Sequence, residues 1–247
     1  MTSLSRSCEV DRIVREYARR ASEIPSDFYA LDKPANLFIH QQRSRRVLSL
    51  LAGIGLLPLR GKRALEVGCG AGGWLPELES WGVRRSDLAG IDLDPGRIET
   101  ARTFLCARRD ETGRVLSHGA DIQCGDATSL PWPASRFDLV IVSTVFSSIL
   151  DHEMRRDVAA EILRVLRPEG VVVWYDFFVD NPRNPNVRGV DRRQIRALFH
   201  GCDVGLSRVT LAPPLARRIV PISWGAAMAI EACRLLNTHH LGVIRKK

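Results

Sequence analysis

The chain alternates between short apolar runs and longer segments whose apolar residues recur at helical spacing. Short runs occupy residues 64–67, 88–91, 139–142 and 171–175, with a weaker one around Ile122, and each has the length of a buried strand. Segments 74–80, 95–109 and 153–166 between them show helical spacing. Because strand and helix alternate, the pattern predicts an α/β domain with a mostly parallel sheet.

Two further amphipathic segments precede the first strand. Residues 9–22 and 34–51 carry apolar side chains at helical spacing, so we expect two helices there. The interpretation is an N-terminal helical cap over residues 1–58, followed by one compact domain over residues 59–247.

The regular alternation ends after Asp176. Residues 180–190 are polar and proline-rich, which indicates a loop at the carboxyl end of a central strand, where open α/β sheets bind their ligands. Beyond this loop the pattern predicts a capped helix over residues 191–199, a strand over 204–211, a helical segment over 213–236 and a final strand over 241–245.

A glycine-rich turn follows the first predicted strand. Glu66 is followed by glycines at positions 68, 70 and 72. Glycine allows positive φ and lets a ligand lie against bare peptide groups, so the turn predicts close approach of a cofactor. The next predicted strand ends in Asp92, at the distance where a carboxylate accepts hydrogen bonds from a ribose diol.

The same turn excludes two phosphate-binding motifs. A dinucleotide fingerprint requires Gly-x-Gly-x-x-Gly, which disfavours a nicotinamide oxidoreductase, and no Lys-Ser or Lys-Thr pair follows as in a phosphate-gripping loop. A carboxylate at the strand end suits a ligand that carries an ammonium and a sulfonium group. This description fits S-adenosylmethionine.

Five landmarks in register resemble the class I S-adenosylmethionine-dependent methyltransferases over roughly residues 60–180. They are the Glu66 to Gly72 turn, Asp92, the Gly125-Asp126-Ala127 step, the strand Phe137 to Ile141, and the segment Leu163 to Gly170. The resemblance implies a Rossmann-like, seven-stranded methyltransferase sheet that is mostly parallel, with an antiparallel last strand inserted between two others. It also implies S-adenosyl-L-methionine as the cofactor and methyl transfer as the activity.

The turn and the resemblance together predict the cofactor-binding residues. Asp92 is expected to accept from both ribose hydroxyls, Asp126 from the adenine amino group, and the Ala127 N–H to donate to the adenine ring. Glu66 would orient the loop or hold the ammonium group through water. The full predicted set is Glu66, Gly68, Cys69, Gly70, Gly72, Asp92, Leu93, Asp126, Ala127, Ser143 and Thr144.

Catalytic residues are harder to predict, because a sulfonium is already a good leaving group and the enzyme mainly aligns the acceptor and excludes water. A hydroxyl acceptor does need a base. Asp176, His152 and His40 are the candidates that lie where this fold would place a substrate. The competing interpretations are a solvated or helix-capping residue for His152 and an inert residue for each of the others.

The loop after Asp176 contains the predicted substrate-binding residues. Its asparagines and arginines form a donor-rich surface suited to hydroxyl groups, and this region resembles methyltransferases associated with bacterial polysaccharide or natural-product pathways. We therefore expect a saccharide or other small-molecule acceptor; a solvated connection is the alternative. The predicted contacts are Tyr175, Asn181, Arg183, Asn184, Asn186 and Arg188.

Composition narrows the class of protein further. The 247 residues are 45% hydrophobic, enough for one sizeable core. No apolar run is long enough for a membrane span and the first residues do not form a signal core, so we expect a cytoplasmic protein. Six cysteines without a Cys-x-x-Cys pair argue against a zinc site and a disulfide framework, and we predict no metal.

The formal charge of +8 raises the question of nucleic acid. Arginines account for nearly all of the positive charge and alternate with acids along the predicted helices, so we do not expect a nucleic-acid partner. The alternatives that stay open are an RNA methyltransferase and a non-catalytic module that binds S-adenosylmethionine. The oligomeric state, a homodimer included, stays open as well.

Overall fold

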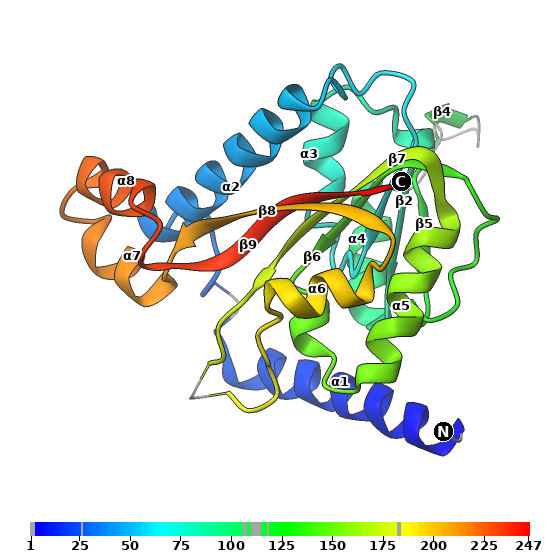
Figure 1. The fold of residues 1–247 in the computed structure, drawn as a ribbon, viewed down its shortest axis with the longest axis horizontal. Helices are drawn as coiled ribbons and strands as arrows, with labels where there is room; N and C mark the ends of the chain where they lie inside the picture. The colour runs from blue at the N-terminus through cyan, green and yellow to red at the C-terminus, as the bar shows by residue number, and fades with distance from the viewer. Residues whose placement is uncertain (1–2, 26, 106–107, 110–114, 118, 182–183) are drawn as a thin grey trace.

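A computed structural model of the protein describes residues 3–25, 27–105, 108–109, 115–117, 119–181 and 184–247. Its centre is a seven-stranded sheet in the order β5-β2-β1-β6-β7-β9-β8 (Figure 1). The strands are β1 Ala64–Val67, β2 Leu88–Asp92, β5 Asp121–Cys124, β6 Phe137–Ser143, β7 Leu166–Phe177, β8 Cys202–Leu211 and β9 Asn237–Lys246.

The topology confirms the predicted fold class. Strands β5, β2, β1, β6 and β7 run parallel, and β9 lies antiparallel between β7 and β8. Parallel order puts the carboxyl ends of β1, β2, β5, β6 and β7 along one edge of the sheet. That edge, where the loops after these strands meet, is the region that positions the candidate site.

Helices cover both faces of the sheet, which explains why the central strands are apolar throughout. One core lies beneath α5 His152–Val165 and α6 Arg192–Leu198. A second core lies beneath α2 Pro34–Gly53, α3 Leu75–Ser80 and α4 Pro95–Leu105. Alternate residues of β1 divide between the two cores: Leu65 and Val67 face α5, and Ala64 faces α2.

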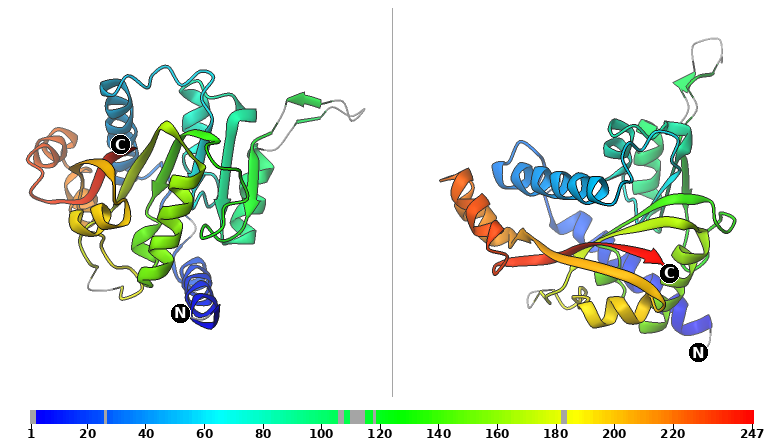
Figure 2. Two further views of the ribbon diagram at one scale, coloured as in Figure 1. Left: turned by 45° about the vertical axis from the view of Figure 1, so that its right-hand side comes forward. Right: turned by 45° about the horizontal axis from the view of Figure 1, so that its top comes forward.

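The two N-terminal helices occupy different places in the fold. Helix α1 Ser3–Glu23 runs past the carboxyl edge of the sheet, where Arg12 Nη2 donates to Ser148 O at 2.6 Å (Figures 1 and 2). Helix α2 packs on the opposite face and contacts β8 and β9. The predicted helices at 9–22 and 34–51 are confirmed, and α1 extends beyond its predicted start.

Two predicted helices need correction, one in the C-terminal part of the chain and one nearer its centre. The segment predicted as helical over 213–236 is two helices, α7 Pro213–Ile219 and α8 Trp224–Ala232, because Pro221 interrupts the backbone donors and Ser223 starts a new helix as its cap. The helix predicted over 95–109 ends at Leu105. The short hairpin of β3 Arg108–Arg109 and β4 Val115–Ser117 follows and was not expected.

The remaining short elements are the 3₁₀ turns η1 Arg85–Asp87 and η2 Phe146–Ser148. Among the helices of the described residues, none combines the length and the apolar character that crossing a bilayer requires.

Candidate cofactor and acceptor site

The turn after β1 has a backbone that requires glycine at two positions. Gly68 and Gly70 have φ of 72° and 51°. A Cβ on Gly68 would lie 2.4 Å from Val145 Cγ2, and a Cβ on Gly70 would lie 2.5 Å from Arg97 Nη2. The positive φ values favour glycine at both positions, and at Gly68 a side chain would also collide with Val145.

Two buried carboxylates hold the turn in place. Asp92 Oδ2 accepts from Gly70 N–H at 2.8 Å, and Glu66 Oε2 accepts from Trp74 N–H at 2.9 Å. Burial raises the pKa of Glu66 to about 8, although the bond from Trp74 opposes the shift. Together they brace the middle and the far end of the loop, which leaves its peptide groups rigidly placed.

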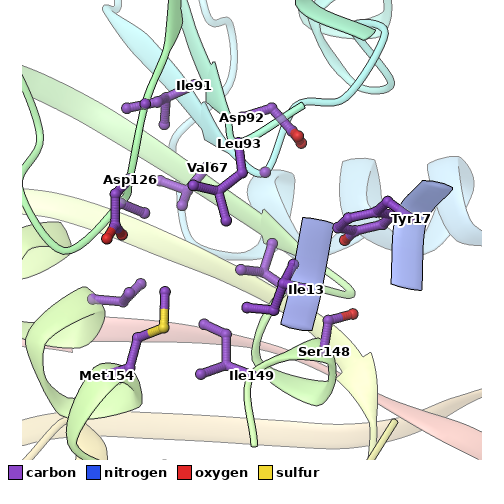
Figure 3. Close-up of a pocket in the computed structure, with 15 residues that line it drawn as sticks. Ile13, Tyr17, Val67, Ile91, Asp92, Leu93, Asp126, Ser148, Ile149 and Met154 are labelled. Carbon is purple, nitrogen blue, oxygen red and sulfur yellow. The ribbon is translucent and has the colours of Figure 1, made fainter. Parts of the chain in front are cut away.

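A pocket opens beside this turn (Figure 3). In the close-up, Val67, Ile91 and Leu93 lie on one side, while Ile149 and Met154 lie opposite. Ile13 and Tyr17 of α1 close a third side; the other lining residues are Gly68, Asp92, Gly125, Asp126, Ala127, Val145, Ser148 and Val158.

The donor and acceptor set of this pocket fits an adenosyl group. Asp92 accepts from Gly70 and Asp94 N–H groups, which leaves carboxylate lone pairs for a ribose. Asp126 Oδ1 accepts from Thr128 N–H at 2.9 Å, and Oδ2 has no partner among the described residues. Apolar side chains offer the flat walls that a base needs, and no residue lining this pocket carries a positive charge for phosphate.

The pocket brings together five of the predicted cofactor residues: Gly68, Asp92, Leu93, Asp126 and Ala127. Glu66 and Gly70 lie beneath or within the turn that forms its wall. The other four predicted residues do not line it.

Those four residues have other surroundings. Cys69 is buried in the second core, where burial raises the pKa of its thiol well above the usual range. A Cβ on Gly72 would contact Leu105 instead of the pocket. Thr144 N–H donates to Tyr175 O at 2.8 Å and its hydroxyl donates to Ser143 O, so these two residues join the ends of β6 and β7.

The structure does not bring the three predicted catalytic residues together. Asp176 is fully buried; its Oδ2 accepts from Ser147 N–H at 3.0 Å and its Oδ1 from Phe177 N–H at 2.8 Å. Burial raises its pKa to about 6. His152 is exposed at the start of α5, and His40 on α2 lies 2.9 Å from Glu77 Oε1. The hydrogen bond from Ser147 N–H makes Asp176 an anchor for the segment after β6.

The predicted substrate loop is largely occupied by contacts within the protein. Asn184 Nδ2 and Asn186 Nδ2 donate to the two carboxylate oxygens of Glu16 on α1, at 3.3 and 2.9 Å. Arg188 is exposed, and its N–H donates to Ser147 O. Asn181 is exposed and has a partner of its own, and Arg183 lies outside the described residues. The loop therefore fastens α1 over the pocket.

An aromatic and histidine cluster lies where β7 and β9 pair at the same edge of the sheet. The His239 ring stacks on Tyr175, with ring centroids 4.6 Å apart and planes 13° apart, and lies 3.9 Å from Phe177. The Tyr175 hydroxyl shares a hydrogen bond of 2.9 Å with Thr210. Sequence reasoning missed His239, because only strand pairing shows that it faces Phe177.

His239 is held neutral by its surroundings. It is 3% exposed, and burial together with the nearby Arg43 guanidinium lowers its pKa to about 3. Its Nδ1 lies 3.0 Å from Thr238 Oγ1, and its Nε2 has no hydrogen-bond partner among the described residues. The ring is therefore uncharged at neutral pH, and a bare imidazole nitrogen can accept a hydrogen bond.

Arg43 of α2 connects the two parts of the site and was also missed. Its guanidinium carbon lies 4.1 Å from the ring centroid of Trp74, which ends the glycine turn, and 5.9 Å from that of Tyr175. It pairs with Glu77 at 3.3 Å, yet its Nε is buried without a partner. A buried donor of this kind favours an anionic ligand group such as a carboxylate.

Within the described residues, no group of three or more His, Cys, Asp or Glu side chains could hold a metal ion.

Comparison with known proteins agrees with this geometry. Residues 65–174 match the family described as a methyltransferase domain. A phthiotriol/phenolphthiotriol dimycocerosates methyltransferase of Mycobacterium leprae is 31% identical over 147 residues, which cover 56% of this chain and 49% of that protein. A fatty-acid O-methyltransferase of Mycolicibacterium smegmatis is 38% identical over 119 residues, covering 48% of this chain and 38% of that protein. The chain thus spans about half or less of these curated relatives.

Among solved structures, a phosphoethanolamine N-methyltransferase 1 of Haemonchus contortus in complex with phosphoethanolamine and S-adenosylhomocysteine matches with a TM-score of 0.64. The identity is 14%, and the match covers 100% of this chain and 50% of that one. At this identity the likeness shows the fold.

The matched segment, the sheet order and the glycine turn define a class I S-adenosylmethionine-dependent methyltransferase fold. Residues 65–174 are similar to the methyltransferase domain family, and the pocket beside the glycine turn is the place in this chain where S-adenosylmethionine fits.

Proposed function

We propose that this protein transfers a methyl group from S-adenosylmethionine to a hydroxyl oxygen of a largely apolar small molecule. The observation that carries the proposal is the cluster of Tyr175, Phe177 and His239 at the end of β7 and β9. It places aromatic rings and one neutral imidazole, with Tyr175 and His239 largely buried, at the sheet edge that also carries the glycine turn. A hydroxyl acceptor needs apolar contacts and a group that orients its oxygen.

The polar loop supports a saccharide acceptor less well than its composition indicated. The amides of Asn184 and Asn186 donate to Glu16, so they are already used within the protein. The aromatic side chains at the carboxyl end of β7, Tyr175 and Phe177, are better suited to an apolar acceptor. The relatives named above, a dimycocerosates methyltransferase and a fatty-acid O-methyltransferase, agree with this substrate class.

In this proposal each part of the chain has a physical role. Bound S-adenosylmethionine supplies a methyl group on a sulfonium, which is an excellent leaving group. Asp92 and Asp126 orient the adenosyl part, and Arg43 holds the carboxylate of the methionine part. His239 accepts a hydrogen bond from the acceptor hydroxyl and positions its oxygen. Helix α1 excludes water, fastened through Glu16 and through Glu9 Oε1, which accepts from Leu150 N–H at 2.5 Å.

The test combines cofactor binding with methyl transfer from radiolabelled S-adenosylmethionine. Calorimetry with S-adenosylhomocysteine measures the donor pocket, and a panel of hydroxylated fatty acids, phenols, sterols and sugars measures the acceptor. We expect labelled methyl ethers from the apolar members and none from the sugars. His240→Gln serves as the control for His239→Gln, because both rings are buried on adjacent residues of β9.

Two outcomes would contradict the proposal. Transfer to sugars alone would show that the aromatic cluster does not select the acceptor. Tight cofactor binding without transfer to any member of the panel, or to total RNA, would favour a binding module over an enzyme.

A further inference from the structure

A helical hairpin formed by residues 212–236 connects β8 to β9. It contains α7 and α8, and its base is closed where Ala212 N–H donates to Leu236 O at 2.9 Å. Figures 1 and 2 show the hairpin at the end of these two long strands, apart from α5 and the glycine turn. Its inner side packs on α2, with Trp224 edge-on to Phe38 at 5.2 Å between ring centroids.

The outer side of the hairpin is apolar and exposed. Ile222 before α8 is 86% exposed, and Leu235 after α8 is 80% exposed. Between them, one exposed face of α8 consists of Gly225, Met228, Ala229 and Ala232, at the helical spacing of three and four residues. A helix face without a single polar side chain calls for a covering partner.

The exposed charges of the hairpin itself have one sign. Arg217, Arg218 and Arg234 are exposed on the hairpin. The only acid between residues 204 and 247 is Glu231, and it is 3% exposed because it is turned inward to the Thr210 N–H. The hairpin therefore presents apolar groups ringed by cations, with no exposed acid of its own.

This combination selects among the possible partners. A second copy placed by a twofold axis would set the same three arginines against one another, which is unfavourable. An anionic bilayer surface satisfies both features, since apolar side chains enter the headgroup region and arginines attract anionic headgroups. We propose that the hairpin docks on the surface of an anionic lipid bilayer.

The hairpin adjoins the acceptor side of the molecule. The Arg217 guanidinium lies 4.4 Å from the Phe28 ring, in the connection between α1 and α2, where Tyr29 is 65% exposed. Docking through the hairpin would turn this connection and the carboxyl ends of β7 toward the membrane. An apolar acceptor could then reach the site without crossing water, although the docking itself does not depend on the proposed reaction.

Vesicle flotation of the whole protein tests the proposal. The probes are vesicles of phosphatidylcholine alone and vesicles in which about a third of the lipid is phosphatidylglycerol. Each arginine near an anionic surface strengthens binding about fivefold, so three favour the anionic vesicles on the order of 100-fold at low salt. The preference should fall steeply as salt is raised.

Two variants separate the apolar and the charged contributions. Ile222→Asp with Leu235→Asp should reduce binding to anionic vesicles at least tenfold, and Arg218→Glu with Arg234→Glu should remove the preference for them. Phe104→Asp is the matched control, because Phe104 is 65% exposed on α4, in another part of the molecule. The affinity for S-adenosylhomocysteine should stay unchanged in all three variants, which also shows that they fold.

Failure of the wild type to float with anionic vesicles would overturn the inference, and so would equal binding to both vesicle types. A dimer in sedimentation that Ile222→Asp dissociates would assign the face to a second copy instead. Loss of vesicle binding in Phe104→Asp would show that vesicle binding is not specific to the hairpin, which would overturn the inference. None of these outcomes depends on methyl transfer, so they bear on docking alone.

Discussion

The donor side and the acceptor side of the site are built in different ways. The proposed donor side comes mostly from the ends of β1, β2 and β5: β1 leads into the glycine turn, β2 ends in Asp92, and Asp126 follows β5. The proposed acceptor side joins Tyr175 and Phe177 of β7 to His239 of β9, which lies more than sixty residues further along the chain and meets them through the antiparallel pairing of the two strands.

This difference has a physical consequence. The donor side is fixed by local backbone geometry, so changes there should act on cofactor affinity. The acceptor side is fixed by strand register and packing, so changes there should act on turnover and stability while the cofactor still binds. The following predictions test this separation in order of expected effect.

Replacing Asp92 with Ala should cause the largest effect. The change removes the acceptor for Gly70 N–H and for the ribose, and two charge-assisted hydrogen bonds correspond to an affinity loss on the order of 100-fold for S-adenosylhomocysteine, measured by calorimetry. Asp94→Ala is the control, because the Asp94 side chain is half-buried and accepts only from N–H groups at the start of α4. Equal losses in both variants would argue against a ribose contact.

The change His239→Gln should lower the rate of methyl transfer on the order of 100-fold, because misplacing the reacting oxygen by about 1 Å costs on that order. Binding of S-adenosylhomocysteine should stay within twofold of the wild type. His240→Gln, whose ring stacks on Phe178 at 4.4 Å, should retain most of the rate. If both variants lose the cofactor as well, the two sides of the site are not separable.

Glu66→Gln tests whether charge or bracing matters at the start of the turn. The amide oxygen can still accept from Trp74 N–H, so the turn is kept while the negative charge is removed. We expect about a tenfold weaker affinity for S-adenosylhomocysteine, together with a higher thermal midpoint, because the buried carboxylate is unfavourable when ionised. Unchanged affinity would leave Glu66 with the bracing role alone.

The pH dependence of stability should report His239. Its pKa is lowered to about 3 in the folded protein, so the unfolded chain binds a proton first as pH falls below about 6.5. The stability that His239 contributes is complete above that pH and is lost as the pH falls toward 3. Urea unfolding should show about 2 kcal/mol less loss between pH 6.5 and 5 in His239→Gln than in the wild type.

Two other buried groups act in the opposite direction and do not disturb this comparison. Glu66 and Asp176 have raised pKa values, about 8 and about 6, so they bind protons more readily in the folded state. Each therefore favours folding as pH falls. Both are present in the wild type and in the variant, and parallel slopes in the two proteins would contradict the assignment to His239.

Much of the donor side could be predicted from sequence because its signals are local. The alternation of strands and helices, the glycines of the turn and the carboxylate after β2 lie in order along the chain, and the structure gathers Gly68, Asp92, Leu93, Asp126 and Ala127 around one pocket. The positions of Cys69 and Gly72 could not be predicted, since a side chain's direction within a tight turn depends on the backbone angles of each residue.

The acceptor side could not be predicted in the same way. Asp176 reads as a polar group at the end of a strand, but its orientation toward the α5 face buries it against Ser147. The sequence predicts Asn184 and Asn186 to be free donors in an open loop. In the structure both amides donate to Glu16 of α1, which lies near the other end of the chain. Such contacts arise only when distant segments meet.

The order of strands and helices, the conformation of the glycine turn and the class of cofactor followed from the sequence itself, because hydrophobic periodicity and backbone freedom act over a few neighbouring residues. The tertiary structure alone decided which polar side chains form hydrogen bonds that hold α1 and the loops, and which histidine is buried beside the aromatic rings. It also decided that the outer face of α8 is exposed. These outcomes depend on the register of β9 and on helix packing, where residues far apart in the chain compete for the same partners.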